Sequence, residues 1–155
     1  PISCEHLVTG ADYFARQKVQ TTHLNWYIVE QLPLIAPDAY AQPLSQTTVG
    51  DFVRGEVLRL SYTAHDLADF ARDLGYTGAP FAWDDEDRRQ RMARLDALYF
   101  RLYGLDRDEA AYVLDTFPIV REHDEAAFNR YRSKDLVLGY MNALAAGDTT
   151  TVLEL

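Results

Sequence analysis

The stretch Leu95–Pro118, LDALYFRLYGLDRDEAAYVLDTFP, encodes two helices and the turn between them. Its first half places apolar side chains at helical spacing, at Leu95, Leu98, Tyr99, Leu102 and Tyr103. Gly104 follows, and glycine readily takes the left-handed conformation that ends a helix. Asp106 and Glu109 then have the spacing of a capping box, which begins the next helix. The stretch therefore predicts a helical hairpin with its turn at Gly104.

Helical periodicity continues on both sides of this hairpin. Helices are expected over residues 52–59, 66–73, 85–103 and 134–145. Ser133 is placed as the N-cap of the last helix, and Gly147 is placed to end it. Pro118 drives Phe117 into extended geometry, so a further short helix is expected to begin only at or near Asp124.

The first third of the chain is less regular. Residues 12–18 are typical of the end of a helix, or of a strand, and Asn25 is placed to cap a short helix over 26–31. Residues 33–43 contain three of the six prolines, which predicts an extended crossing. The sequence thus predicts a mainly α fold: a helical domain with a short irregular or partly β N-terminal segment.

The expected organisation is an N-terminal arm over 1–45, a helical domain over 46–147 and a frayed tail over 148–155. A chain of 155 residues, 48% of them hydrophobic, can bury one sizeable core. Because Pro1 stands where an initiator methionine would be, we expect the chain to be a piece of a longer protein.

The charge balance argues against tight DNA binding by this chain alone. The formal net charge is −9, whereas affinity for the DNA backbone comes from Lys and Arg that displace counterions. The arginines of 88–94 follow the acidic cluster 84–87, which predicts a helix start and a solvated face with local ion pairs. A second basic cluster, Arg121, Arg130, Arg132 and Lys134, is interleaved with acids. It is compatible with a network of ion pairs between the last helices or with a surface for the DNA backbone.

Motifs for chemistry are absent from the sequence. The four histidines, His6, His23, His65 and His123, have no metal-binding spacing, and Pro37-Asp38 is not followed by the Glu-x-Lys or Asp-x-Lys of a common nuclease fold. Cys4 is the single cysteine, which fits a reducing cytosol. No apolar run approaches the ~18 residues of a membrane span. We expect a cytoplasmic chain that is not itself an enzyme and that binds no cofactor, metal or membrane.

Three segments resemble one family. Residues 95–134 are similar to the pattern LDALYFxLYGLxxxEAxYVLDTFPIVRxxDExxFxxYRTK found near the C-terminus of large bacterial restriction-modification enzymes with an N6-adenine DNA methyltransferase. Residues 15–33, ARQKVQTTHLNWYIVEQLP, resemble that family's ARQKVGGTHLNFFIVEQLP, and residues 60–81 resemble its connecting piece. The chain departs from the pattern at Gln20 and Thr21, where the family has two glycines that permit close approach of the backbone to a ligand.

The resemblance implies a C-terminal fragment of a DNA methyltransferase. The catalytic motifs, a glycine-rich loop for S-adenosylmethionine and a (D/N/S)PP(Y/F/W) motif, do not occur in this chain, so S-adenosylmethionine is expected in the parent enzyme only. The implied partners are double-stranded DNA, reached through the parent enzyme, and the methyltransferase domain of the same polypeptide.

The candidate DNA-binding residues lie where the resemblance places the join to the target-recognition part. Arg16 and Lys18 are candidates for phosphate contacts, and His23 and Asn25 for hydrogen bonds to a phosphate or a base edge. Their alternative role is the formation of a turn and a helix cap. The aromatic residues of the second half are expected to pack in the core instead of stacking on bases: Tyr99, Phe100, Tyr103, Tyr112, Phe117, Phe128, Tyr131 and Tyr140.

Two hypotheses of function follow. In the first, the chain is the noncatalytic C-terminal fragment of a restriction-modification DNA methyltransferase and helps to recognise or position the DNA target. In the second, it is a structural module that docks on the methyltransferase domain without touching DNA.

Overall fold

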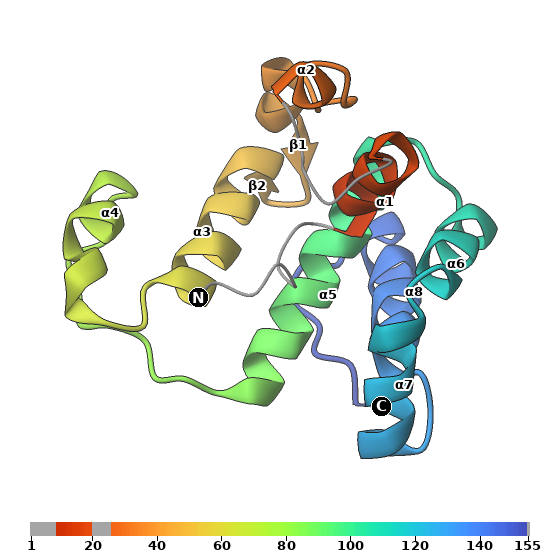
Figure 1. Cartoon of the computed structure of the whole chain (residues 1–155). Coiled ribbons are helices and arrows are strands. Elements are labelled where there is room, and N and C mark those ends of the chain that lie inside the picture. The colour runs from red at the N-terminus through yellow and green to blue at the C-terminus, as the bar shows by residue number, and fades with distance from the viewer. Residues whose placement is uncertain (1–8, 20–25, 155) are drawn as a thin grey trace.

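The computed structural model describes residues 9–19 and 26–154, and its fold is mainly α, as expected (Figure 1). The α-helices are α1 Thr9–Lys18, α2 Trp26–Val29, α3 Val49–Ser61, α4 Ala68–Asp73, α5 Asp85–Leu102, α6 Arg107–Asp115, α7 Pro118–Phe128 and α8 Arg132–Ala145. The 3₁₀ helices η2 and η3 span Pro37–Ala41 and His65–Leu67, and the strands are β1 Pro43–Leu44 and β2 Thr47–Thr48.

The long helix α5 forms the centre of the molecule. It lies between α3 and α8, and its main partner is α8, on which α6 and α7 also pack (Figure 1). The side chains of Leu98 and Phe100 on α5 and of Leu136 and Tyr140 on α8 are almost completely buried. Burying a large apolar side chain contributes roughly 1.5–3 kcal/mol, so this interface is a main source of stability.

The turn between α5 and α6 has the predicted construction. Gly104 has a φ of +76°, in the left-handed region. The Asp106 carboxylate accepts the backbone N–H of Glu109 at 2.9 Å, and the Glu109 carboxylate accepts the N–H of Asp106 at 2.9 Å. The capping box and the left-handed glycine are therefore both confirmed.

The segment after this hairpin differs from its prediction. Helix α7 begins at Pro118, not near Asp124, because proline at the first helical position needs no N–H partner and already has a helical φ. Phe117, with φ −109° and ψ 71°, is the nonhelical residue before it. Ser133 is not an N-cap, since α8 begins one residue earlier; its backbone N–H instead donates to the Asp124 carboxylate of α7 at 2.5 Å.

The N-terminal segment contains a short hairpin in front of α3. Strands β1 and β2 pair antiparallel, with Leu44 opposite Thr47, so the expectation of a partly β segment is confirmed. Thr48 then caps α3 by accepting the N–H of Asp51 at 3.1 Å. The expected extended crossing over 33–43 is wrong in part, because the proline at residue 37 begins the 3₁₀ helix η2.

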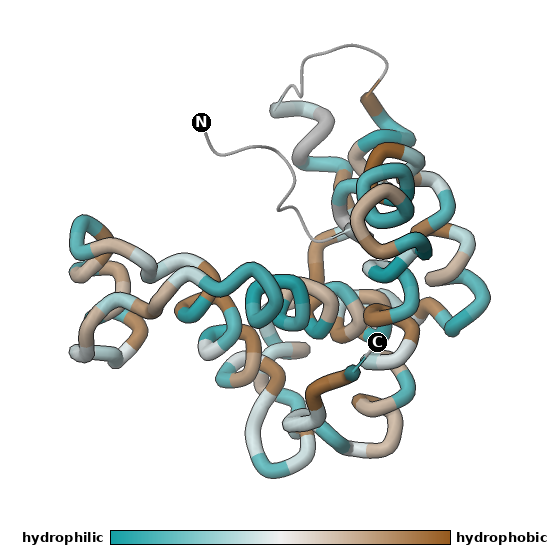
Figure 2. Tube along the Cα trace, turned by 90° about the horizontal axis from the view of Figure 1, so that it is seen from below, coloured by the Kyte–Doolittle hydropathy of each residue, from teal (hydrophilic) through white to brown (hydrophobic). Residues whose placement is uncertain are grey.

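Helix α4 belongs to a second, smaller apolar cluster. Leu58 and Tyr62 at the end of α3 are buried with Ala71 of α4, and Phe81 packs against them. Figure 2 shows α4 at the edge of the molecule, apart from the helices that surround α5. This cluster holds the segment between α3 and α5 against the end of α3 and is separate from the main core.

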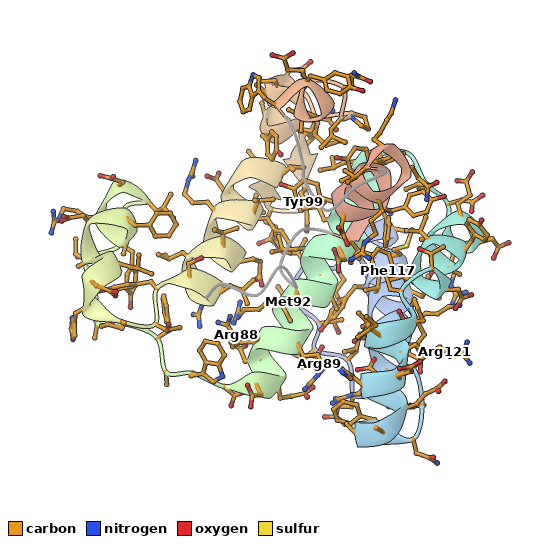
Figure 3. All side chains as sticks on the ribbon, viewed as in Figure 1. Arg88, Arg89, Met92, Tyr99, Phe117 and Arg121 are labelled. Carbon is orange, nitrogen blue, oxygen red and sulfur yellow. The ribbon has the colours of Figure 1, made fainter. Side chains whose placement is uncertain are left out.

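The arginines of α5 form the expected local ion pairs, Arg89 with Glu86 at 2.9 Å and Arg91 with Asp87 at 2.8 Å, but they are not all on a solvated face. Arg91 donates to the Glu56 carboxylate of α3 at 3.0 Å, and Arg94 reaches the same carboxylate at 3.5 Å. Glu56 and Arg94 are 7% and 8% exposed. Arg88 stacks on Trp83 at 3.8 Å and donates to a backbone carbonyl of α3. Figure 3 shows Arg88 on the side of α5 that faces α3. Because α3 packs against α5, Arg88, Arg91 and Arg94 form contacts between the two helices.

Core packing of the aromatic residues is confirmed for Phe100, Phe117 and Tyr140, which are buried. It is wrong for Tyr112, which is 65% exposed. Tyr112 lies two positions after the buried Ala110, and residues two apart on a helix point in nearly opposite directions. The face of α6 that carries Tyr112 is therefore turned away from α8.

The C-terminal segment makes contacts with the core that the sequence did not predict. Leu153 packs against the main apolar cluster, and its carbonyl accepts the Gln90 side-chain amide of α5 at 2.9 Å. The hydroxyl of Tyr140 donates to the same Gln90 side chain. These bonds satisfy a glutamine that is only 3% exposed.

Within residues 9–19 and 26–154, no helix has the length and apolar character needed to cross a lipid bilayer.

Candidate DNA-contacting surface

Helix α1, which carries Arg16 and Lys18, is held against the helical body at its N-terminal end. The backbone N–H of Thr9 donates to the Asp96 carboxylate of α5 at 2.6 Å, and the Thr9 hydroxyl donates to it at 2.7 Å. Further along α1, the Phe14 ring meets the Tyr103 ring edge to face, with centroids 5.4 Å apart. The first turn of α1 is thus fixed on α5, and a later turn is fixed on Tyr103, the residue that follows the end of α5.

Arg16 is already engaged within the protein. Its Nε atom pairs with the Asp12 carboxylate at 2.8 Å, and its guanidinium lies 5.1 Å from the centre of the Phe117 ring. Figure 3 marks the position of Phe117 below α1. The Arg16 side chain is nevertheless 64% exposed, so a phosphate could share its outer N–H groups.

Lys18 is the exposed cation at the end of α1. Both Arg16 and Lys18 lie in the last turn, where positive charge also stabilises the negative end of the helix dipole. The structure therefore places both predicted residues in the last turn of α1, where their side chains, two positions apart, point in nearly opposite directions.

His23 and Asn25 lie outside the described residues. The next helix, α2, contacts α1 and begins at Trp26. The side chains of Trp26 and Tyr27 are 74% and 64% exposed, so neither is part of the core. Exposed aromatic rings on a helix that contacts α1 are compatible with contacts to nucleic acid.

Asp96 was not among the residues predicted from the sequence. Burial raises the pKa of its carboxyl from 3.8 to about 6, although the hydrogen bonds from Thr9 act in the opposite direction. A signal was present in the sequence: Met92, Tyr99 and Phe100 surround Asp96 at helical spacing, which places a carboxylate among apolar neighbours.

A pair of tyrosine contacts ties the N-terminal arm to α5. The hydroxyls of Tyr40 and Tyr99 lie 3.1 Å apart, and the Tyr103 hydroxyl donates to the Pro33 carbonyl at 2.9 Å. Burial and the neighbouring Tyr40 hydroxyl raise the pKa of Tyr99 above its ordinary value. Burial likewise raises the pKa of Tyr103, so the hydroxyls of Tyr99 and Tyr103 stay protonated near neutral pH and act as structural hydrogen-bonding groups.

Two of the four residues of the second basic cluster form ion pairs between helices, and Arg121 pairs with Glu125 within α7 at 2.7 Å. Arg132 of α8 pairs with Glu86 of α5 through two N–H groups, at 2.6 and 2.8 Å, and Lys134 of α8 pairs with Asp115 of α6 at 2.7 Å. Burial opposes ionisation of Glu86, yet the bonds from Arg132 and Gln90 leave its pKa below the ordinary value. Of the two interpretations of this cluster, the ion-pair network is the one that these contacts favour.

The described part of the chain contains no group of three His, Cys, Asp or Glu side chains that could hold a metal ion. The two described histidines, His65 and His123, lie on η3 and α7, far apart in the sequence. The residues gathered on α1 and α5 are suited to hold and orient a segment of the chain.

Comparison with protein-family models, with curated proteins and with solved structures finds no match to this chain.

Proposed function

We propose that this chain is the noncatalytic C-terminal part of a restriction-modification N6-adenine DNA methyltransferase and that it positions the DNA target. The support from sequence is the resemblance of residues 15–33 and 95–134 to that family. In this proposal, methyl transfer and the S-adenosylmethionine site belong to the rest of the parent enzyme.

The attachment of α1 to the helical body is the observation that carries the proposal. Asp96 accepts two hydrogen bonds from Thr9 at the start of α1, and the Phe117 ring contacts Arg16 near its end. A helix held at both ends keeps a defined orientation. The proposed target-recognition part, adjacent to this helix in the resemblance, would therefore be held at a fixed position by α5, α6 and α7.

Within this proposal, Lys18 contacts a DNA phosphate and Arg16 assists it. The exposed Lys18 has the freedom to reach a phosphate, whereas Arg16 shares its charge with Asp12 at 2.8 Å. Phosphate contacts set the register of a protein on DNA without reading its sequence. With a net charge of −9, the affinity of this chain alone is expected to be weak and strongly dependent on salt.

The internal pairing of the cations favours a second candidate function, that of a docking module for the methyltransferase domain. Arg91, Arg132 and Lys134 all pair with carboxylates of another helix, so their charges are not directed at a ligand. A module of this kind would stabilise the parent enzyme and make no contact with DNA.

Duplex binding measured by fluorescence anisotropy over a range of salt concentrations separates the two functions. DNA positioning predicts weak binding at low salt and a salt slope that is smaller by about one for Lys18→Ala. Arg107→Ala is the matched control, because it removes another exposed cation, on α6, and should leave the slope unchanged.

The same two variants in a full-length enzyme that contains this chain complete the test. DNA positioning predicts that Lys18→Ala raises the KM for DNA and leaves kcat for methyl transfer nearly unchanged. If Lys18→Ala and Arg107→Ala behave alike in both assays, the positioning role of Lys18 is wrong and the docking function is favoured.

A further inference from the structure

A groove lies between α1 and α6, and apart from the Phe14–Tyr103 contact and the Glu109 capping bond its lining residues take part in none of the contacts described above. It has a volume of about 420 Å³, and its lining residues are Tyr13, Phe14, Leu105, Asp108, Glu109, Tyr112 and Val113. The volume lies within the range of roughly 300–1,000 Å³ that is typical of ligand pockets. One or two large side chains of a partner would fill it.

The chemistry of the groove is apolar with an acidic rim. Phe14 and Leu105 contribute apolar surface, whereas Asp108 and Glu109 contribute carboxylates. No Lys, Arg or His is among the described residues that line it. The Glu109 carboxylate also accepts the N–H of Asp106, so Asp108 is the carboxylate that a ligand can use most freely.

Tyr112 extends this surface beyond the groove. It is 65% exposed on a helix whose other face, with Ala110 and Leu114, is buried. Helix α6 therefore presents an aromatic side chain next to two carboxylates. Nucleic-acid phosphates would be repelled by this charge, and a cation with an apolar body would be attracted.

We propose that this groove binds a basic amphipathic segment of a protein partner. An apolar side chain of the partner enters between Phe14 and Val113 and packs on Tyr112, while a lysine or arginine beside it pairs with Asp108. This is the helix-in-groove mode of recognition, with charge complementarity at the rim setting the kind of partner. The inference stands apart from the proposed function, since it requires no DNA.

The test uses a short synthetic peptide of leucine and lysine, with leucines at helical i, i+3 and i+4 spacing, and the same peptide with every lysine replaced by glutamate. Titration of the isotopically labelled 155-residue chain is followed by NMR. The lysine peptide should shift the resonances of Phe14, Tyr112 and Val113, and the glutamate peptide should not. Tyr112→Ala should weaken binding by about tenfold without altering the charge of the protein.

Matched acidic variants separate the groove from attraction to the net charge. Asp108→Asn should weaken binding severalfold, whereas Asp66→Asn, which removes an exposed acid from η3, should not. Thermal unfolding of each variant establishes that it is folded. Equal affinity of Tyr112→Ala and the unaltered chain would overturn the proposal. So would resonance shifts that depend on protein concentration without peptide, because a second copy of the chain would then occupy the groove.

Discussion

Asp96 joins α1 to α5, and its burial lowers the stability of the fold at neutral pH. Its carboxylate is the acceptor for both Thr9 donors, which fastens α1 to α5. Burial raises its pKa from 3.8 to about 6, so the ionised form that accepts these bonds best is also the form that burial disfavours. Asp96 thus supplies the position of α1 at some expense of stability at neutral pH.

The sign of the pH dependence follows from the direction of this shift. Because the pKa of Asp96 is raised in the folded state from 3.8 to about 6, the group contributes stability below about pH 4 that is lost as pH rises through about 6. Asp96→Asn should remove this loss, which is on the order of 1–3 kcal/mol. Urea unfolding near pH 4 and near pH 7 measures it.

Asp66→Asn is the control for this measurement, since it removes an exposed acid and should keep the pH dependence of the unaltered chain. Asp51 and Asp87, whose pKa values are lowered by hydrogen bonds from their neighbours, act in the opposite direction in every variant and cancel in the comparison. An Asp96→Asn variant with an unchanged pH dependence would contradict the role given to burial.

At the scale of the element, the ends of the helices and the contacts between them are specified differently. Local sequence is sufficient for the end of α5 at Gly104 and for the capping box that begins α6. The start of α8, by contrast, depends on the Asp124 carboxylate of α7, nine residues before Ser133 in the sequence. A helix end completed by another helix cannot be recognised from its own residues.

Gly104 and Gly55 provide a matched pair of substitutions, one in the turn between α5 and α6 and one inside a helix. Gly104 has a φ of +76°, and a Cβ atom added there would meet nothing within 4 Å, so Gly104→Ala introduces backbone strain alone. It should destabilise the fold by about 1–2 kcal/mol. Gly55 lies inside α3, also with nothing within 4 Å of an added Cβ, and Gly55→Ala should stabilise by about 0.5–1 kcal/mol. Thermal unfolding of the two variants should therefore give shifts of opposite sign.

The contact between α3 and α5 contains a buried charge whose removal should be severe. Glu56 is 7% exposed and accepts bonds from Arg91 and Arg94, of which Arg94 is 8% exposed. Glu56→Ala leaves a buried guanidinium without its partner and should cost about 3–5 kcal/mol in the free energy of unfolding. Chemical denaturation measures this loss. Glu122→Ala, on the exposed face of α7, is the control. Equal losses in the two variants would show that the ion pairs of Glu56 with Arg91 and Arg94 add nothing to stability.

At the scale of the whole molecule, the C-terminal segment returns to the centre of the fold. The Gln90 amide of α5 donates to the Leu153 carbonyl at 2.9 Å, and Leu153 packs on the main core. A Cβ atom added to Gly139 of α8 would lie 2.6 Å from the Leu153 side chain. The close approach of this segment thus depends on a glycine in the middle of a helix.

Removal of the Leu153 side chain measures how much this segment contributes to stability. Leu153→Ala should lower the free energy of unfolding by about 1–3 kcal/mol, because it removes apolar contacts with the core. The adjacent Val152 is 62% exposed, and Val152→Ala should have little effect. Urea unfolding distinguishes them, and similar effects of the two substitutions would contradict the packing of Leu153.

The candidate site could be predicted only in part. The sequence was enough to place Arg16 and Lys18 on one helix end, because that depends on local periodicity. It did not reveal that Arg16 also contacts Phe117, a residue more than one hundred positions away along the chain. Nor did it reveal Asp96 as the attachment point of α1 or the groove beside α6. Each of these requires two helices to be brought together.

The sequence by itself determined where α5 and α6 meet and that the fold is mainly α. These properties follow from nearest neighbours along the chain: periodicity, capping and the freedom of glycine. Only the tertiary structure decided which charges are buried, which aromatic residues remain exposed, and which face of α6 is left uncovered. The physical reason is that a side chain is buried only where two surfaces meet. A helix of given sequence therefore has no buried face until another element covers it.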